Sequence, residues 1–62
     1  MPLVHMKLND QRLSPQNEKD LLVALTDAVV SVFGEDVRRH TWVIVEGVPP
    51  TRWGIGGTPL PS

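Results

Sequence analysis

The chain has 62 residues, no cysteine, and a formal net charge of −1 from six basic and seven acidic side chains. A domain this small buries only about 60% of the surface of its unfolded chain, so it usually depends on disulfides, a metal or partner subunits. The absence of cysteine excludes a disulfide framework, and the two histidines, His5 and His40, lack the spacing of a zinc motif. Oligomerisation is the remaining source of stability.

The charge balance and the apolar segments also limit the partners. No basic run exceeds Arg38-Arg39, which argues against a nucleic-acid or membrane-surface footprint. No segment approaches the roughly 20 apolar residues of a membrane span, and the N-terminus lacks the charged and apolar regions of a signal peptide. We therefore expect a cytoplasmic protein without nucleic-acid or membrane partners.

The first predicted element is a strand from Pro2 to Leu8. Apolar side chains recur at every second position, so Val4, Met6 and Leu8 fall on one face, a period of two that is typical of a strand with one buried face. The next five residues, 9–13, are mostly polar and predict a connection.

A helix of about 19 residues follows. Ser14 is a typical N-cap residue and Pro15 a typical first helical residue, while Gly34 is a natural residue to end the helix. Its apolar residues form two adjacent stripes that predict a broad buried face: Leu21, Leu25, Ala28 and Val32 in one, and Leu22, Val29 and Phe33 in the other.

A second strand is predicted from His40 to Glu46. Its unbroken apolar run, Trp42 to Val45, favours burial on both faces inside a sheet. Strand, helix and strand in this order predict a β-α-β unit with parallel strands and a right-handed crossover. Gly47, Val48 and the two prolines after them should end the strand, and the glycine-rich segment 54–57 suits a short hairpin or arm.

One helix over two strands leaves sheet edges and one sheet face uncovered. Two such units joined edge to edge would form a four-stranded sheet with two helices on one side, and its opposite face would still need a cover. The predicted fold is therefore of the α/β (α+β) class, a single β-α-β unit with a short C-terminal hairpin. We expect the units to dimerise and the dimers to assemble further.

The side chains offer no conventional catalytic set, but the backbone offers one candidate base. The chain has no nucleophile-elbow serine pattern, no phosphate loop and no dinucleotide fingerprint. Removal of Met1 would expose the secondary amine of Pro2. The reference pKa of an α-amino group is about 8, and burial or a nearby guanidinium would lower it. A neutral amine near pH 7 can act as a general base.

Taken together, these features resemble the 4-oxalocrotonate tautomerase family of the tautomerase superfamily, whose members work with an amino-terminal proline. The resemblance covers nearly the whole chain, residues 1–62, as a single domain. It depends on the short β-α-β plan, the start MPLVHMKL, Arg12 directly after the first strand, the Ser-Pro-Gln helix start, and the segment RWGIGG at 52–57. It implies a trimer of dimers, a homohexamer in which the glycine-rich hairpin packs on a neighbouring subunit.

The resemblance also implies roles for individual residues. Pro2 matches the general base, and Arg12 matches the arginine that holds a substrate carboxylate. Trp53 falls where the family has an aromatic residue, usually phenylalanine, that lines the pocket. Trp42 stands where the best-known members have a second catalytic arginine. Its indole is one neutral donor, so a monocarboxylate with an apolar or aromatic tail fits better than the usual dicarboxylate.

The function implied is a cofactor-independent keto–enol tautomerase acting on enol or dienol forms of 2-oxo acids, with Trp53, Trp42 and Arg52 as candidate substrate-binding residues. Spacing leaves open whether Arg38, Arg39 or Arg52 replaces the missing arginine. Two alternatives also stay open. One is a hydratase or dehalogenase in which Pro2 acts as an acid and Asp10 or Glu46 activates water. The other is a non-catalytic subunit of a homo- or hetero-oligomer that retains Met1.

Overall fold

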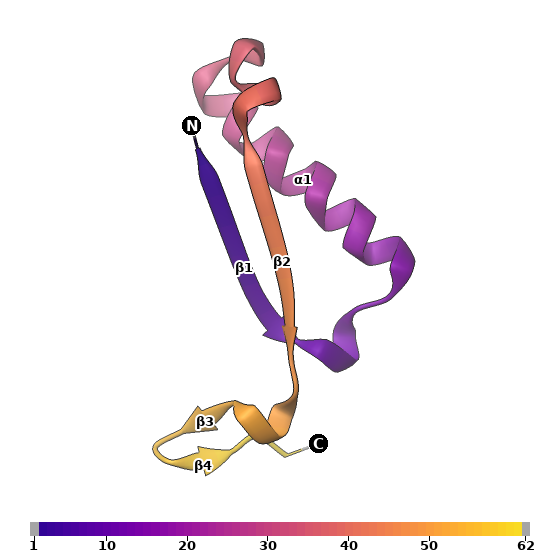
Figure 1. Ribbon diagram of the computed structural model, residues 1–62, viewed down its shortest axis with the longest axis vertical. Coiled ribbons are helices and arrows are strands. Elements are labelled where there is room, and N and C mark those ends of the chain that lie inside the picture. The colour runs from indigo at the N-terminus through magenta and orange to yellow at the C-terminus, as the bar shows by residue number, and fades with distance from the viewer. Residues whose placement is uncertain (1, 62) are drawn as a thin grey trace.

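The computed structural model describes residues 2–61, so Met1 and the prediction of its removal lie outside the described residues. The main sheet consists of two parallel strands, and one helix covers one face of it (Figure 1). A second, antiparallel ladder forms the C-terminal hairpin. The elements in chain order are β1 (Leu3–Asn9), α1 (Pro15–Phe33), β2 (Trp42–Val48), β3 (Gly54–Ile55) and β4 (Thr58–Pro59). The predicted β-α-β unit with a short hairpin is confirmed.

Strand β1 has the predicted alternation. The side chains that face α1, Val4, Met6 and Leu8, are partly buried, whereas the residues between them are exposed. Strand β2 has the same pattern in register, because Val4 pairs with Val43 and Met6 with Val45. The other face, which we call the outer face, carries Leu3, His5, Lys7, Trp42, Ile44 and Glu46.

Helix α1 begins and ends where the sequence predicts. The Ser14 Oγ accepts a hydrogen bond from the Asn17 backbone N–H at 3.2 Å, and the Asn17 Oδ1 accepts one from the Ser14 N–H at 2.7 Å. This reciprocal pair satisfies N–H groups that have no partner inside the helix. At the other end Gly34 adopts φ 98° and ψ 167°, a conformation that is essentially restricted to glycine.

The buried stripe of α1 is narrower than predicted. Leu21, Leu25 and Val29 are partly buried, but Val32 and Phe33 are 74% and 70% exposed. The reason is length: the last turn of the helix runs beyond the two strands it covers (Figure 1). In one copy of the chain, most of the surface of these two side chains is therefore open to solvent.

Three short 3-10 segments, which the sequence patterns did not predict, connect the elements: η1 (Asp10–Arg12), η2 (Glu35–His40) and η3 (Pro50–Arg52). Segment η2 moves the start of β2 from His40 to Trp42, because the Thr41 N–H and hydroxyl bond back to the carbonyls of Arg38 and Val37 at 3.2 and 2.7 Å. Gly47 and Val48 stay paired with β1, so β2 ends at Val48 rather than Glu46.

The expectation that β2 is buried on both faces is wrong for a single copy. On the outer face Trp42 is 59% exposed and Ile44 is 44% exposed. Among residues 2–61 Pro50 is the one buried residue, and no large apolar side chain there is fully buried. One helix covers only one side of a two-stranded sheet, and the second side remains open to solvent.

The hairpin stands apart from the β-α-β unit as an arm (Figure 1). The radius of gyration is 14.3 Å, whereas a compact chain of this length would have about 11 Å. The arm is held by a tight turn and by a hydrogen bond of its own. Gly56 and Gly57 adopt positive φ angles at the turn. The Leu60 N–H donates to the Trp53 carbonyl at 2.9 Å. A projecting arm of this kind is suited to contact with a second molecule.

Candidate functional site

Pro2 lies at the start of the sheet, next to Trp42. The Trp42 N–H donates to the Pro2 carbonyl at 2.9 Å, and Leu3 pairs with Trp42 in register. This bond holds the residue that carries the candidate nitrogen at the amino end of both parallel strands. Pro2 is partly buried and Trp42 is largely exposed on the outer face. We call this place the proline end.

Arg12 lies at the opposite end of the sheet, in η1. Segment η1 is fixed by local hydrogen bonds: the Asn9 Oδ1 accepts from the Gln11 N–H at 2.9 Å, and the Asn17 Nδ2 donates to the Arg12 carbonyl at 2.6 Å. The Arg12 side chain itself is exposed, and no ion pair to it is found within the described chain. Its guanidinium is available for a ligand carboxylate.

Gly47 allows η1 to lie this close to the sheet. A Cβ at position 47 would come within 2.9 Å of the Asp10 Cβ and of the Leu13 Cδ1, and within 3.1 Å of the Asp10 Cα. Both distances to Asp10 are tighter than ordinary van der Waals contact. The missing side chain of Gly47 therefore sets the position of the segment that carries Arg12.

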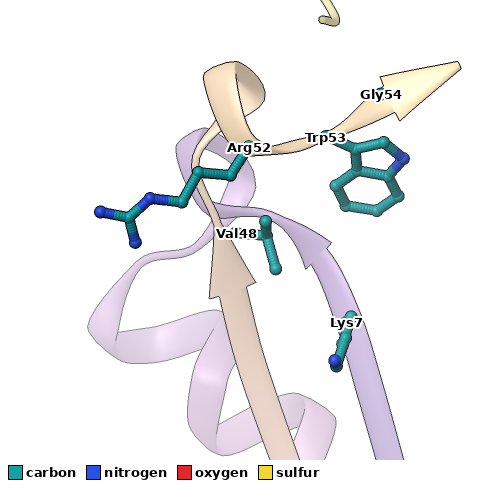
Figure 2. Close-up of a pocket in the computed structure, with 5 residues that line it drawn as sticks. All are labelled: Lys7, Val48, Arg52, Trp53 and Gly54. Carbon is teal, nitrogen blue, oxygen red and sulfur yellow. The ribbon is translucent and has the colours of Figure 1, made fainter. Parts of the chain in front are cut away.

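Trp53 forms one wall of a hollow of about 280 Å³ beside the same end of the sheet (Figure 2). The hollow is lined by Lys7, Val48, Arg52, Trp53 and Gly54. Lys7 lies below the indole, whereas the Arg52 guanidinium points away from it, on the other side of Val48 (Figure 2). Lys7 was not singled out by the sequence patterns; the structure places it opposite Glu46 on the outer face.

The predicted site residues therefore fall into two separate groups in one copy. Pro2 and Trp42 lie at the proline end, and Arg12, Arg52 and Trp53 lie at the other. The seven residues of β1 between these groups span about 23 Å at 3.3 Å per residue. No single copy brings the Pro2 nitrogen and the Arg12 guanidinium to the same small molecule.

The three arginines considered as replacements for the missing second catalytic arginine differ in their surroundings. Arg38 is ion-paired to Glu35 and Asp27 at 2.7 and 2.9 Å, and hydrogen bonds to these two carboxylates raise its pKa above the ordinary value. Arg38 therefore links η2 to α1, and its charge is already paired with these two carboxylates rather than free for a ligand. Among the described residues, the Arg39 side chain donates only to the His40 ring, at 3.3 Å. Arg52 belongs to the Trp53 hollow.

The two carboxylates considered for water activation lie away from Pro2 in the same copy. Asp10 begins η1 and packs over Gly47. Glu46 lies opposite Lys7 and accepts a hydrogen bond from the His5 Nε2 at 2.9 Å. Within residues 2–61 there is also no cluster of three or more metal-binding side chains, and no helix there is long and apolar enough to cross a membrane.

Comparison with known proteins gives a consistent answer. A family model described as "Tautomerase enzyme" matches residues 2–61. The chain is 30% identical over 57 residues to the probable tautomerase K2 of Dickeya dadantii (strain 3937), an alignment that covers 92% of this chain and 84% of that protein. It is also similar to the crystal structure of TomN, a 4-oxalocrotonate tautomerase homologue in the tomaymycin biosynthetic pathway. The TM-score is 0.82 and the identity 38%, with 94% of this chain and 86% of that chain covered. The chain belongs to the tautomerase family and is an enzyme of the isomerase class.

Proposed function

We propose that the chain is a cofactor-independent tautomerase of enol or dienol 2-oxo acids, with Pro2 as the general base and Arg12 as the carboxylate-binding residue. The observation that carries the proposal is a tautomerase-family chain in which Pro2 is held at the end of a parallel sheet by the hydrogen bond from Trp42. Loss of Met1 makes the nitrogen of Pro2 a free secondary amine, which can exchange a proton with substrate near neutral pH.

The active site is formed between copies of the chain. The length of β1 separates Pro2 from Arg12 and Trp53, so a second copy must bring its Arg12 end to the first copy's proline end. Two further observations support assembly: the outer face carries exposed Leu3, Trp42 and Ile44, and the hairpin arm projects from the unit (Figure 1). Apolar surface of this extent is usually covered in a stable oligomer. A hexamer built from three dimers is the assembly we propose.

In the reaction, the neutral Pro2 nitrogen accepts the proton of the enol hydroxyl. The oxygen electron pair forms the new C=O bond, the C=C electron pair takes the proton back from the nitrogen at carbon, and the amine is neutral again. The Arg12 guanidinium binds the carboxylate through two parallel hydrogen bonds. Its charge also draws electron density along the conjugated chain and helps to keep the nearby amine unprotonated.

The direct test is substitution of these two residues in the processed protein. In the Pro2→Ala variant a primary amine replaces the secondary amine, so kcat should fall by at most the roughly 10²- to 10⁴-fold that a positioned general base usually contributes. The Arg12→Ala variant should chiefly raise KM for acidic enols, with a smaller effect on neutral enols. An unchanged kcat in the first variant would exclude a requirement for the secondary amine of Pro2. An equal effect on acidic and neutral enols in the second would exclude the carboxylate role.

A further inference from the structure

The hairpin arm has one apolar face with an exposed tip. Ile55 pairs with Thr58, and the Leu60 N–H donates to the Trp53 carbonyl at 2.9 Å. Paired residues share a face and side chains alternate along each strand, so Trp53, Ile55 and Leu60 lie on the same face of the arm. Ile55, next to the glycine turn, is 67% exposed. A stiff arm that ends in an exposed apolar side chain is suited to insertion against apolar groups of another molecule.

The last turn of α1 offers an apolar surface, which we call the helix-end patch and which consists of Val32 and Phe33. Their side chains are 74% and 70% exposed. The space beside them is open, because a Cβ added at Gly34 would meet nothing within 4 Å. Directly after the patch, η2 borders a hollow of about 450 Å³ whose lining is entirely charged: Glu35, Asp36, Arg38 and Arg39. The patch therefore has an apolar centre and a charged rim.

The arm and the rim carry complementary charges. From Pro49 onward the chain has one charged side chain, Arg52, and its guanidinium points away from the Trp53 indole (Figure 2). In the rim Glu35 is already paired with Arg38, whereas Asp36 has no ion pair within the described residues. Asp36 is thus the acidic group that remains available to a basic partner.

Within one copy the arm and the helix-end patch lie at opposite ends of the molecule. Helix α1 ends near the start of β1, and the arm lies beyond the end of β2 (Figure 1). The longest dimension of the chain is 43 Å, so the arm cannot fold back onto its own patch. A second copy that brings its Arg12 end to the first copy's proline end also brings its arm to the first copy's helix-end patch.

We propose that the hairpin arm of one copy docks on the helix-end patch of a second copy. Ile55 packs against Val32 and Phe33, and Arg52 pairs with Asp36. The consequence for catalysis rests on the proposed function: docking holds Trp53, two residues before Ile55, at the end of the sheet where the second copy carries its proline. Ile55 and Phe33 are then positioning residues that do not touch the substrate.

Cross-linking tests the contact directly, because the chain has no cysteine of its own. Phe33→Cys and Ile55→Cys chains, one of them carrying a heavy-nitrogen label, are mixed, dissociated, reassembled and treated with a short bismaleimide. The heterodimer, recognised by its mass, should be the main product. Val23→Cys in place of Phe33→Cys is the matched control, since Val23 is also exposed but lies about 15 Å away along α1. No heterodimer, or an equal yield with the control, would overturn the proposal.

Charge reversal tests the ionic part without any cysteine. Arg52→Glu and Asp36→Arg each place like charges together, so each should raise the dissociation constant of the assembly about threefold or more. The two changes in one chain restore opposite charges and should restore the wild-type constant. Lys19→Glu with Asp36→Arg has the same net charge and should not restore it. A double variant no tighter than the single variants, measured by sedimentation over a dilution series, would contradict the Arg52–Asp36 contact.

Turnover separates this inference from the proposed function. Ile55→Ser and Phe33→Ser should each lower kcat/KM about tenfold or more, because they remove an apolar contact between copies, whereas the conservative Ile55→Val and Phe33→Leu should keep most of it. Cross-linking at these positions without any turnover would refute the tautomerase proposal and leave the docking contact intact. Normal turnover in both serine variants, without cross-linking, would do the reverse.

Discussion

Replacement of Gly47 by alanine should weaken substrate binding from a distance, through the segment that carries Arg12. The added Cβ would lie 2.9 Å from the Asp10 Cβ and 3.1 Å from the Asp10 Cα, whereas ordinary contacts lie at 3.4–4 Å. The Leu13 Cδ1, also at 2.9 Å, can move away by rotation. The Asp10 backbone can retreat only if η1 moves as a unit, by about 0.5 Å to reach ordinary contact.

Two consequences follow from this displacement. Overpacking of this kind destabilises a protein by about 1–3 kcal/mol. In addition, a guanidinium moved by half an ångström loses the geometry of a paired carboxylate bond, so KM for an acidic enol should rise roughly three- to tenfold. Chemical denaturation measures the first effect and steady-state kinetics the second.

Gly34→Ala is the matched control. A Cβ there would meet nothing within 4 Å, but the φ of 98° is strained for any other residue, so the expected loss of stability is also about 1–3 kcal/mol. Gly34 ends α1, far along the chain from η1, and KM should stay at the wild-type value. An unchanged KM in Gly47→Ala, or an equal rise in Gly34→Ala, would refute the reasoning.

Two further predictions concern the helix cap and the proton-transfer role. Ser14→Ala removes one half of the reciprocal cap with Asn17. It should lower the free energy of unfolding, measured by chemical denaturation, by about 1 kcal/mol. Ser31→Ala, on the same helix, is the control, and an equal loss of stability in both variants would contradict the cap assignment. The profile of kcat/KM against pH should rise as the Pro2 nitrogen loses its proton, because only the neutral amine is a base. Activity that instead falls above about pH 8 would indicate a protonated Pro2 acting as an acid, the hydratase-type alternative.

Much of the fold was predictable because its signals are local. The period of two in β1, the Ser14-Pro15 start and Gly34 at the helix end each follow from the conformational preferences of a few adjacent residues. The bounds of the second strand were harder to predict. His40 belongs to η2 and not to the strand. At the other end the strand continues through Gly47, whose missing side chain lets η1 pack there. Such contacts between distant segments leave no periodic signal.

The site was predictable in its residues but not in its arrangement. Residue type and position indicated Pro2, Arg12 and Trp53, whose roles in the reaction stay predictions. Their separation follows from topology: in a parallel pair both strands start at one end, so residues before the strands and residues after them lie far apart. Lys7 was missed because a lone lysine on an alternating strand normally indicates only a solvent-exposed face. The other residues that line its hollow, Trp53 among them, are distant in the sequence.

The most direct test of the central claim, a site formed between copies, is complementation between two impaired variants, assayed with an acidic enol at a concentration far below the KM of the Arg12→Ala variant. Pro2→Ala and Arg12→Ala are mixed in equal amounts, dissociated and reassembled. If each site takes Pro2 from one copy and Arg12 from another, random mixed oligomers should recover activity at roughly a quarter of the sites. Each variant treated alone should recover none. A mixture that stays as inactive as its components would contradict the account, because it would mean that one copy supplies both residues.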